Sequence, residues 1–308
     1  MSTTHSARIF FLLAREANKA VVFRRGPTKW TQMIVWDLES DELEYGQWSK
    51  VKLRPRCCDL SPSGKYLIYL DDQFEENDST TAISKPPYWA ALYKWKHHAP
   101  LFGSGGGVFK SETELELNGI RGSAIATEGL LPENLKVGVF LGDVLKNYNL
   151  WKGHINPLLE HRLKREGWSE IENQSFVEKE TSGNVTRKPS ERWNETNPES
   201  KAPMEPKLFE KKITQSSFLW MISYYHSDMG KTLTTFYLKK RVLKTKLDGF
   251  FWADVDHNGR IIATKNGQLY ASKRLKDGAV QLLNLELLHD LNSQKPTKVE
   301  APDEMKKW

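Results

Sequence analysis

Short apolar runs separated by turn-forming residues repeat along most of the chain, and this pattern is typical of β-strands. The first runs are RIFFLLAR, AVVFRR, QMIVWDL and, after a turn-rich linker, CDLSPSGKYLIYL. Their close succession predicts a meander of antiparallel strands over residues 8–69. Later runs of the same kind are KVGVFLGDV (136–144), SFLWMISYYH (217–226) and LTTFYLKK (233–240).

Two turns are predicted from their residue types. Ser61-Pro62-Ser63-Gly64 joins the fixed φ of proline to the permissive backbone of glycine, directly before an apolar run, and this combination predicts a tight turn. Asn266-Gly267 separates RIIATK from QLYASK. Because both residues tolerate a positive φ, this dipeptide predicts a β-hairpin.

The segment ADVDHNGRIIATK aligns without a gap with CDLSPSGKYLIYL, matching Asp254 to Asp59 and Gly259 to Gly64. The simplest explanation is an internal repeat. Equivalent aspartates favour an equivalent structural role, namely a side-chain hydrogen bond to the following turn. The alternative is a shared catalytic site in which both carboxylates act together with His257.

Three other segments are less regular. The stretch DVLKNYNLWKGHINPLLEHRLKREGW mixes turns with a short helix, and AVQLLNLELLHDLN is interpreted as a strand that leads into a helix. The closing KPTKVEAPDEMKKW is interpreted as an irregular tail.

Residues 172–212 differ from the rest of the chain in composition. They hold many Glu, Lys, Asn, Ser and Pro residues and few aliphatic ones. Such a segment buries too little apolar surface to offset the entropy of ordering, and its prolines remove backbone donors from any ladder. We expect a disordered, mobile insertion that is dispensable for folding, inside one domain that spans residues 1–308.

One part of the chain resembles a blade of a WD-repeat protein. MIVWDLESDEL ends a strand in Trp36-Asp37, and DLSPSGKYLIYL opens the next blade with Ser-Pro-x-Gly. The Gly-His dipeptide expected upstream of Trp-Asp is missing. The resemblance covers residues 8–70 and 217–274. It implies an all-β, β-propeller-like fold, with roughly five to seven four-stranded blades of about 40–45 residues each.

A wider resemblance links the chain to an uncharacterised family of bacterial proteins. The blocks that carry it are CDLSPSGKYLIYL, SKPPYWAALYKW, LKREGW, FFWADVDHNGRIIATKNGQLYA and LLHDLN followed by EAP, in this order. It implies a bacterial origin and a propeller-like fold, and it brings neither an activity nor a functional residue.

Composition places the chain in a reducing compartment. The two cysteines, Cys57 and Cys58, are adjacent, and neighbours in a strand point to opposite faces, which disfavours an ordinary disulfide. The first apolar run lies between Arg8 and Arg15 and is far too short for a signal peptide or a membrane span. The net charge of +6 comes from interleaved acidic and basic residues. We expect a cytoplasmic protein without a membrane partner.

Catalytic, cofactor and metal motifs are not recognised in the sequence. The glycine cluster FGSGGGV (102–108) lacks the Lys-Ser or Lys-Thr of a phosphate loop, the eight histidines lack metal-ligand spacing, and there is no Gly-x-Ser-x-Gly elbow. Cys57 and Cys58 are interpreted as buried packing residues, because a desolvated thiol resists ionisation. We therefore expect no cofactor, no metal and no enzymatic activity.

The first candidate for protein interaction is an aromatic segment that contains Tyr88, Trp89 and Trp95. Large aromatic side chains often anchor protein interfaces. The same residues also form two alternating apolar sets, which is typical of a strand buried on both faces. Both alternatives stay open at this point.

The second candidate is the densest basic run of the chain, residues 239–246, which begins with Lys239, Lys240 and Arg241. Alternate residues of a strand would present several of its charges on one face. Nucleic acid binds such runs through its phosphates, but no nucleic-acid motif surrounds this one. A solvated sheet edge is the plain alternative.

The leading hypothesis is a non-enzymatic scaffold or regulatory subunit that holds another protein in a bacterial regulatory or defence complex. It rests on blades without a catalytic constellation, because propeller scaffolds place variable loops on a rigid ring. The first alternative is a hydrolase or lyase with its site in a central channel. The second alternative is a nucleic-acid-binding accessory protein that uses residues 239–246.

Overall fold

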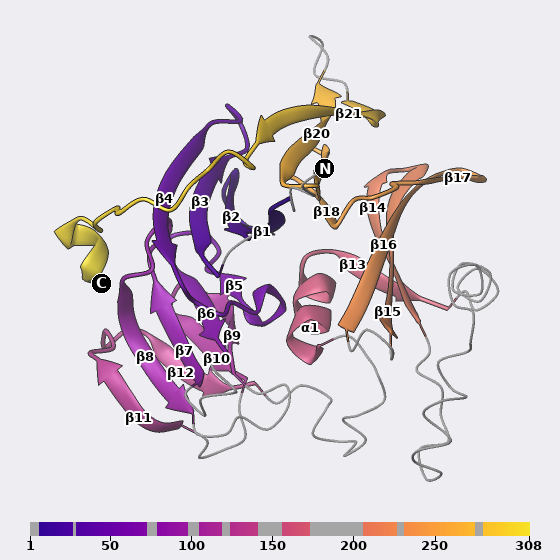
Figure 1. Ribbon diagram of the computed structural model, residues 1–308. Helices are drawn as coiled ribbons and strands as arrows, with labels where there is room; N and C mark the ends of the chain where they lie inside the picture. Colours follow the sequence, from indigo (N-terminus) through magenta and orange to yellow (C-terminus); the bar gives the residue numbers. More distant parts are fainter. Residues whose placement is uncertain are drawn as a thin grey trace, which may run out of the picture.

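The structure, a computed structural model, describes residues 6–26, 29–72, 79–97, 105–118, 124–140, 156–172, 206–226, 231–274 and 280–308 (Figure 1). Within these ranges one α-helix accompanies twenty-one strands, and most strand pairs are antiparallel. The chain is therefore mostly β, as predicted. The described strands form five sheets of three to five strands each, so the sheets are less uniform than a series of four-stranded blades.

The N-terminal sheet is the predicted antiparallel meander. It contains, in spatial order, β1 (Arg8–Leu13), β2 (Lys19–Arg25), β3 (Thr31–Asp37) and β4 (Leu43–Ser49). The apolar runs of β1, β2 and β3 are buried on both faces, which explains why they are continuous rather than alternating. The edge strand β4 carries exposed residues, Glu44 and Tyr45.

The second sheet follows a short 3-10 turn, η1 (Pro55–Cys57). Its strands are β5 (Asp59–Leu60), β6 (Leu67–Asp71), β7 (Ser79–Ser84), β8 (Ala91–His97) and β11 (Ala124–Gly129), in the spatial order β11-β8-β7-β6-β5. A three-stranded sheet contains β9 (Gly107–Ser111), β10 (Glu114–Leu117) and β12 (Lys136–Val139). In it β12 runs parallel to β10.

The helix α1 (Pro157–Arg165) confirms the short helix predicted before residue 168. Asn156 is its N-cap and accepts a hydrogen bond from the Leu158 amide at 2.9 Å, and Pro157 occupies the first turn. The fourth sheet follows with β13 (Trp168–Ile171), β14 (Lys207–Thr214), β15 (Ser217–His226), β16 (Lys231–Lys240) and β17 (Leu243–Lys246), in that order.

Strand β14 corrects the C-terminal boundary of the predicted insertion. Residues 173–205 lie outside the described residues, but residues 207–212 belong to a strand paired on both sides. Phe209 is 0% exposed in the core, and Leu208 is buried on the opposite face. The prediction failed because the many charges around this apolar pair hid it. A deletion that removes residues 207–212 would therefore remove part of the core.

The C-terminal sheet contains β18 (Trp252–Val255), β19 (Ile261–Lys265), β20 (Gln268–Arg274) and β21 (Val280–Asp290), in that order. The helix expected at the end of AVQLLNLELLHDLN is wrong, because residues 280–290 form one continuous strand. Its dense leucines pair with β20 and pack on it, with two breaks in register. The closing residues are irregular apart from a 3-10 turn, η4 (Asp303–Lys306).

The predicted turns are confirmed by their backbone angles. Asn266 and Gly267 have φ of 50° and 78°, and they join Lys265 to Gln268 in a two-residue hairpin. Gly64 and Gly259, aligned in the repeat, both have φ of 73°. The second repeat turn is one residue shorter, since Ser61 pairs with Tyr66 but Asp256 pairs with Arg260.

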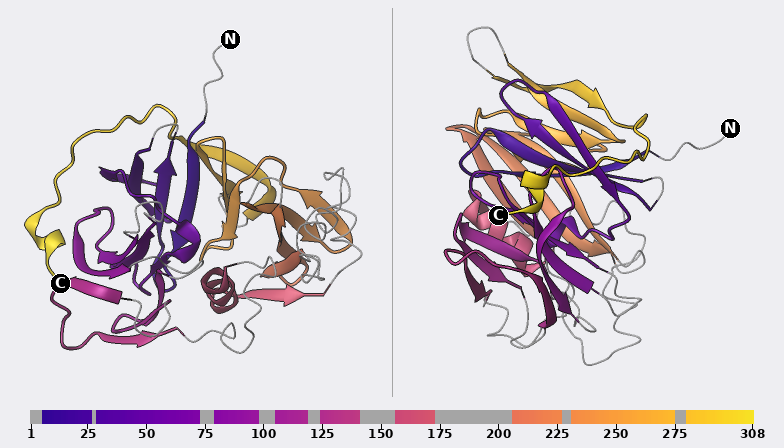
Figure 2. Two further views of the ribbon diagram at one scale, coloured as in Figure 1. Left: turned by 60° about the horizontal axis from the view of Figure 1, so that its bottom comes forward. Right: turned by 90° about the vertical axis from the view of Figure 1, so that its left-hand side faces the viewer.

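The five sheets lie side by side around the middle of the molecule (Figures 1 and 2). Neighbouring sheets meet through β1 and β18, β1 and β5, β5 and β9, and β16 and β18, while α1 contacts both β9 and β13. Trp252 links three sheets, because its ring lies 4.3 Å from Phe10 and 5.8 Å from Phe236. The main hydrophobic core therefore extends across the sheets rather than being divided among them.

Buried polar contacts join the N-terminal and C-terminal sheets. Arg260 binds Asp256 at 2.7 Å within its own turn, and it binds the Asp41 carboxylate across the seam at 2.7 and 3.0 Å. Thr264 Oγ1 donates to the carbonyl of Ile9 at 2.9 Å. This seam fixes the first sheet of the chain against the last.

Residues 291–308, here named the C-terminal strap, run from the C-terminal sheet past β4 towards the second sheet (Figure 2). Arg24 Nε donates to the carbonyl of Leu291 at 3.1 Å, and Lys85 Nζ donates to that of Glu304 at 2.9 Å. Trp308 Nε1 donates to the carbonyl of Leu130 at 2.6 Å. The strap thus ties three sheets together.

Candidate functional site

The aspartate that sequence analysis singled out in β5 belongs to a buried group of charges between α1 and the second sheet. Arg165 binds both oxygens of the Asp59 carboxylate, with N–O distances of 2.8 and 2.7 Å. The Phe109 amide also donates to Asp59, at 2.8 Å. Such paired bonds from one guanidinium fix the geometry of a carboxylate. Asp59 therefore joins β5, β9 and α1.

Glu166, which directly follows α1, extends this group. The central ion cluster is defined as Asp59, Arg162, Arg165 and Glu166. Glu166 accepts a bond from Arg165 at 3.0 Å and lies 3.5 Å from Arg162. Burial raises the pKa of Glu166, and the two arginines oppose that rise. Because the carboxylates and guanidinium groups face one another, the cluster acts as an internal tie.

Asp254 and His257, the other residues of the enzymatic alternative, are engaged in different contacts. Asp254 accepts bonds from Lys211 Nζ and from the Val255 amide, both at 2.7 Å. His257 Nε2 donates to the carbonyl of Ala14 at 2.7 Å. The structure therefore gives Asp59 and Asp254 cross-element ion pairs, and the predicted bonds to the following turns are made by Ser61 and Asp256.

The two cysteines are free and buried, as predicted. Burial raises the pKa of the Cys57 thiol to about 11, and burial raises the pKa of Cys58 as well. A thiol with so high a pKa is rarely present at pH 8 as the thiolate, which is the form that reacts.

We expect both thiols to resist labelling by Ellman's reagent in the folded protein and to react at once in guanidinium chloride. The release of the coloured thiolate at pH 8 measures this difference. Rapid labelling of the folded chain would contradict the buried placement of Cys57 and Cys58.

The glycine cluster considered as a phosphate loop is a packing element where the structure describes it, from residue 105 onward. Gly106 has φ of 78°, and its amide donates to Thr81 Oγ1 at 2.8 Å. A Cβ atom at Gly106 would overlap the carbonyl of Cys57. The glycine is needed because two backbone segments approach each other closely here.

Trp89 lies between the N-terminal and second sheets, whereas Trp95 packs between the second sheet and the three-stranded sheet. The Trp89 ring stacks 6.0 Å from Phe23, and its Nε1 donates to the carbonyl of Gln47 at 3.0 Å. Trp95 is buried in a smaller core cluster, and Tyr88 is half-buried. Trp95 therefore has the core position that the sequence left open, whereas Tyr88 and Trp89 precede β8 and are half-buried.

The basic run forms the end of the hairpin β16–β17, at the outer side of the fourth sheet (Figure 1). Lys240 and Arg241 are exposed, while Lys239 is half-buried. At the tip Val242 is 92% exposed and Leu243 is 71% exposed. Two large aliphatic side chains therefore project into solvent between cationic neighbours.

Three lysines share one face of this hairpin, because cross-strand partners point to the same side. Lys239 pairs with Lys244, and Tyr237 pairs with Lys246. The ammonium groups of Lys239 and Lys244 lie 4.6 and 4.7 Å from the centre of the Trp220 ring. This face, together with Arg241, Val242 and Leu243 at the tip, is named the basic ridge.

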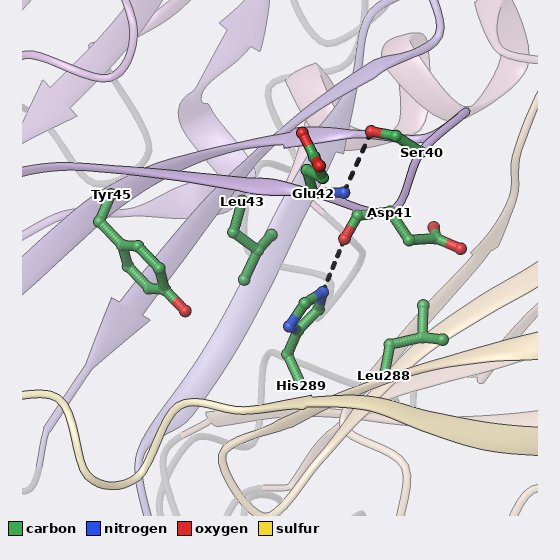
Figure 3. A pocket seen from close by; sticks show the side chains of 7 residues that line it. All are labelled: Ser40, Asp41, Glu42, Leu43, Tyr45, Leu288 and His289. Carbon is green, nitrogen blue, oxygen red and sulfur yellow. Dashed lines mark hydrogen bonds between the residues drawn. The ribbon is translucent and has the colours of Figure 1, made fainter.

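A shallow, open pocket of about 590 Å³ lies at the seam between the N-terminal and C-terminal sheets (Figure 3). Its lining comes from the β3–β4 turn, β4 and β21: Ser40, Asp41, Glu42, Leu43, Tyr45, Leu288 and His289. His289 Nε2 donates to the carbonyl of Asp41 at 2.7 Å. These polar groups stabilise the seam, and the sequence-predicted site residues all lie elsewhere.

Sequence reasoning missed Arg162, Arg165 and Lys211, the cations that bind the buried carboxylates. For the two arginines, the only available signal was an excess of basic residues in the predicted helix. Among the described residues there is no group of three or more His, Cys, Asp or Glu side chains placed to hold a metal. In the same part of the chain, every helix is too short or too polar to cross a membrane.

No family model and no curated protein matches the chain. Among solved structures, the β-propeller domain of the Trilobed protease from Pyrococcus furiosus is 11% identical at a TM-score of 0.23, over 90% of this chain and 68% of that one. Acylaminoacyl peptidase from Pyrococcus horikoshii is 10% identical at a TM-score of 0.28, over 93% of this chain and 45% of that one. An uncharacterised protein from Listeria monocytogenes is 8% identical at a TM-score of 0.23, over 88% of this chain and 63% of that one. Such TM-scores assign neither a fold nor a function to this chain.

Proposed function

We propose that this chain is a non-enzymatic scaffold that binds another protein through the basic ridge. The observation that carries the proposal is the hairpin tip, where Val242 and Leu243 are exposed beside Lys240 and Arg241. An exposed apolar patch that is rimmed by charged residues is a feature of many protein interaction sites. The acidic residues considered for catalysis are instead tied to cations.

The proposal includes an irregular propeller as the supporting architecture. The five sheets would be its blades, with β1, β5, β9 and β18 nearest the axis. In support, these strands form the contacts between neighbouring sheets, and α1 bridges the interval between β9 and β13. A rigid ring of this kind holds the β16–β17 hairpin at a fixed place on the rim.

Nucleic acid is the less favoured partner of the same ridge. Proteins that bind single strands stack bases on accessible aromatic rings. Trp220 is only 2% exposed, and Lys239 and Lys244 lie over its ring. The ring is therefore used to hold the lysines, which favours recognition by charge and apolar contact.

We expect a photo-crosslinking residue at Val242 to capture a specific protein in an extract of the source organism. The matched control is the same residue at Leu130, which is 84% exposed on β11's side of the molecule. A band obtained at Val242 and absent at Leu130 supports the scaffold. Identical bands at both positions, or no band at Val242 under several growth conditions, would overturn it.

A further inference from the structure

The turn that joins β16 to β17 has residues that fit its backbone poorly. Arg241 has φ of 55°, in the left-handed region, and the turn has only two residues, since Lys240 pairs with Leu243. A positive φ at the first residue of a two-residue hairpin turn favours Gly or Asn at that position. The β19–β20 hairpin of the same chain has Asn266 there, with φ of 50°, followed by Gly267 with φ of 78°.

An unfavourable turn residue at an exposed position points to a role outside folding. Neither Arg241 nor Val242 is buried, so packing in the core does not explain them. Their effect is to place one guanidinium group and one branched aliphatic group at the end of the hairpin. A tip of Asn and Gly would lose both groups while keeping the fold.

The charges beside the tip are also arranged against local stability. Lys239 and Lys244 lie directly opposite each other on neighbouring strands, and like charges in such pairs repel. Contacts with the Trp220 ring hold both ammonium groups on the same face. The result is a row of cations next to an apolar tip.

We propose that the basic ridge binds an acidic segment of the partner protein, with its carboxylates on the lysines and Arg241 and an apolar side chain on Val242 and Leu243. The inference rests on the proposed function and names the chemistry of the partner. Charge complementarity selects acidic ligands. The exposed tip selects a peptide over nucleic acid, because a phosphate backbone offers no aliphatic side chain to pack on Val242.

The test uses the full chain and a fluorescent peptide rich in Asp, Glu and Leu, with binding measured by anisotropy. The key variant carries Arg241→Asn together with Val242→Gly, which installs the residues of the β19–β20 turn. We expect its melting temperature to stay equal or to rise, and its affinity for the peptide to fall about tenfold. Thermal melting followed by circular dichroism provides the check on folding.

Single charge reversals distinguish binding at the basic ridge from a general electrostatic attraction between the peptide and the whole chain. Arg241→Glu is expected to weaken binding about tenfold, whereas Lys298→Glu, with the same change in net charge on the C-terminal strap, should weaken it less than twofold. Equal losses for both variants would overturn the proposal. So would unchanged binding by the Arg241→Asn, Val242→Gly variant, or binding of oligothymidine in place of the peptide.

The two proposals fail separately. Crosslinking of a partner at Val242 that persists when Arg241→Glu is added keeps the scaffold but overturns the acidic segment. Specific peptide binding without any crosslinked partner keeps the acidic-peptide site and overturns the scaffold.

Discussion

Asp59→Ala is expected to lower the free energy of unfolding by about 3–5 kcal/mol, because it removes two bonds from a buried guanidinium and leaves the central ion cluster with more cations than carboxylates. Arg165 makes two bonds to the Asp59 carboxylate and is only 15% exposed. The Phe109 amide also loses its acceptor. Urea unfolding followed by tryptophan fluorescence measures the change.

The matched control is Asp303→Ala, which removes an ion pair with Lys306 at the surface. Exposed pairs contribute about 0–1 kcal/mol, so this variant should unfold almost as the parent does. A double variant, Asp59→Leu with Arg165→Met, should be less destabilised than Asp59→Ala, since no unpaired charge remains. A loss below 1 kcal/mol for Asp59→Ala would show that the central ion cluster is not a structural tie.

Gly106→Ala is the second change with a large expected effect. A left-handed backbone costs a non-glycine residue about 1–2 kcal/mol, and the overlap of the new Cβ with the Cys57 carbonyl adds about 1–3 kcal/mol of overpacking. We expect a clear fall in the midpoint of urea unfolding.

Gly259→Ala separates the two contributions. Its φ of 73° is close to the 78° of Gly106, but a Cβ at Gly259 meets no described atom within 4 Å. This variant should lose only the backbone part, about 1–2 kcal/mol. If Gly106→Ala and Gly259→Ala lowered the free energy of unfolding equally, the approach between Gly106 and Cys57 would not be tight.

The strands could be predicted from the sequence where a local signal, such as a turn dipeptide or an apolar run, is enough to determine them. Asn266-Gly267 can adopt two positive φ angles in succession, so the hairpin followed from the residues alone. The meander over residues 8–69 followed from apolar runs that are buried on both faces. In both cases the information lies within about ten neighbouring residues.

Other elements depended on partners far away in the chain. Phe209 is buried because β13 and β15 pair with its strand on both sides, and the sequence around it is as charged as a loop. β21 stays extended because its leucines pair with β20, although the run itself is compatible with a helix. Tertiary pairing overrode local preference at both places.

The central ion cluster could not be predicted for the same reason. Asp59 and Arg165 are 106 positions apart in the sequence, and no periodicity connects them. The internal repeat located the aspartates correctly but gave no indication of their partners. Of the candidate site, the basic run was found from composition, whereas its exposed tip and the left-handed Arg241 required the structure.

The C-terminal strap has a consequence for how the protein is made. Arg24 bonds to Leu291 across 267 positions, so β2 reaches its final state only after the strap has left the ribosome. The N-terminal sheet is synthesised long before residue 291, so the surface that the strap covers stays open while the residues between them are made. Contacts of such long sequence separation slow folding and prolong exposure to aggregation. We expect the nascent N-terminal sheet to depend on chaperones until the strap has been synthesised.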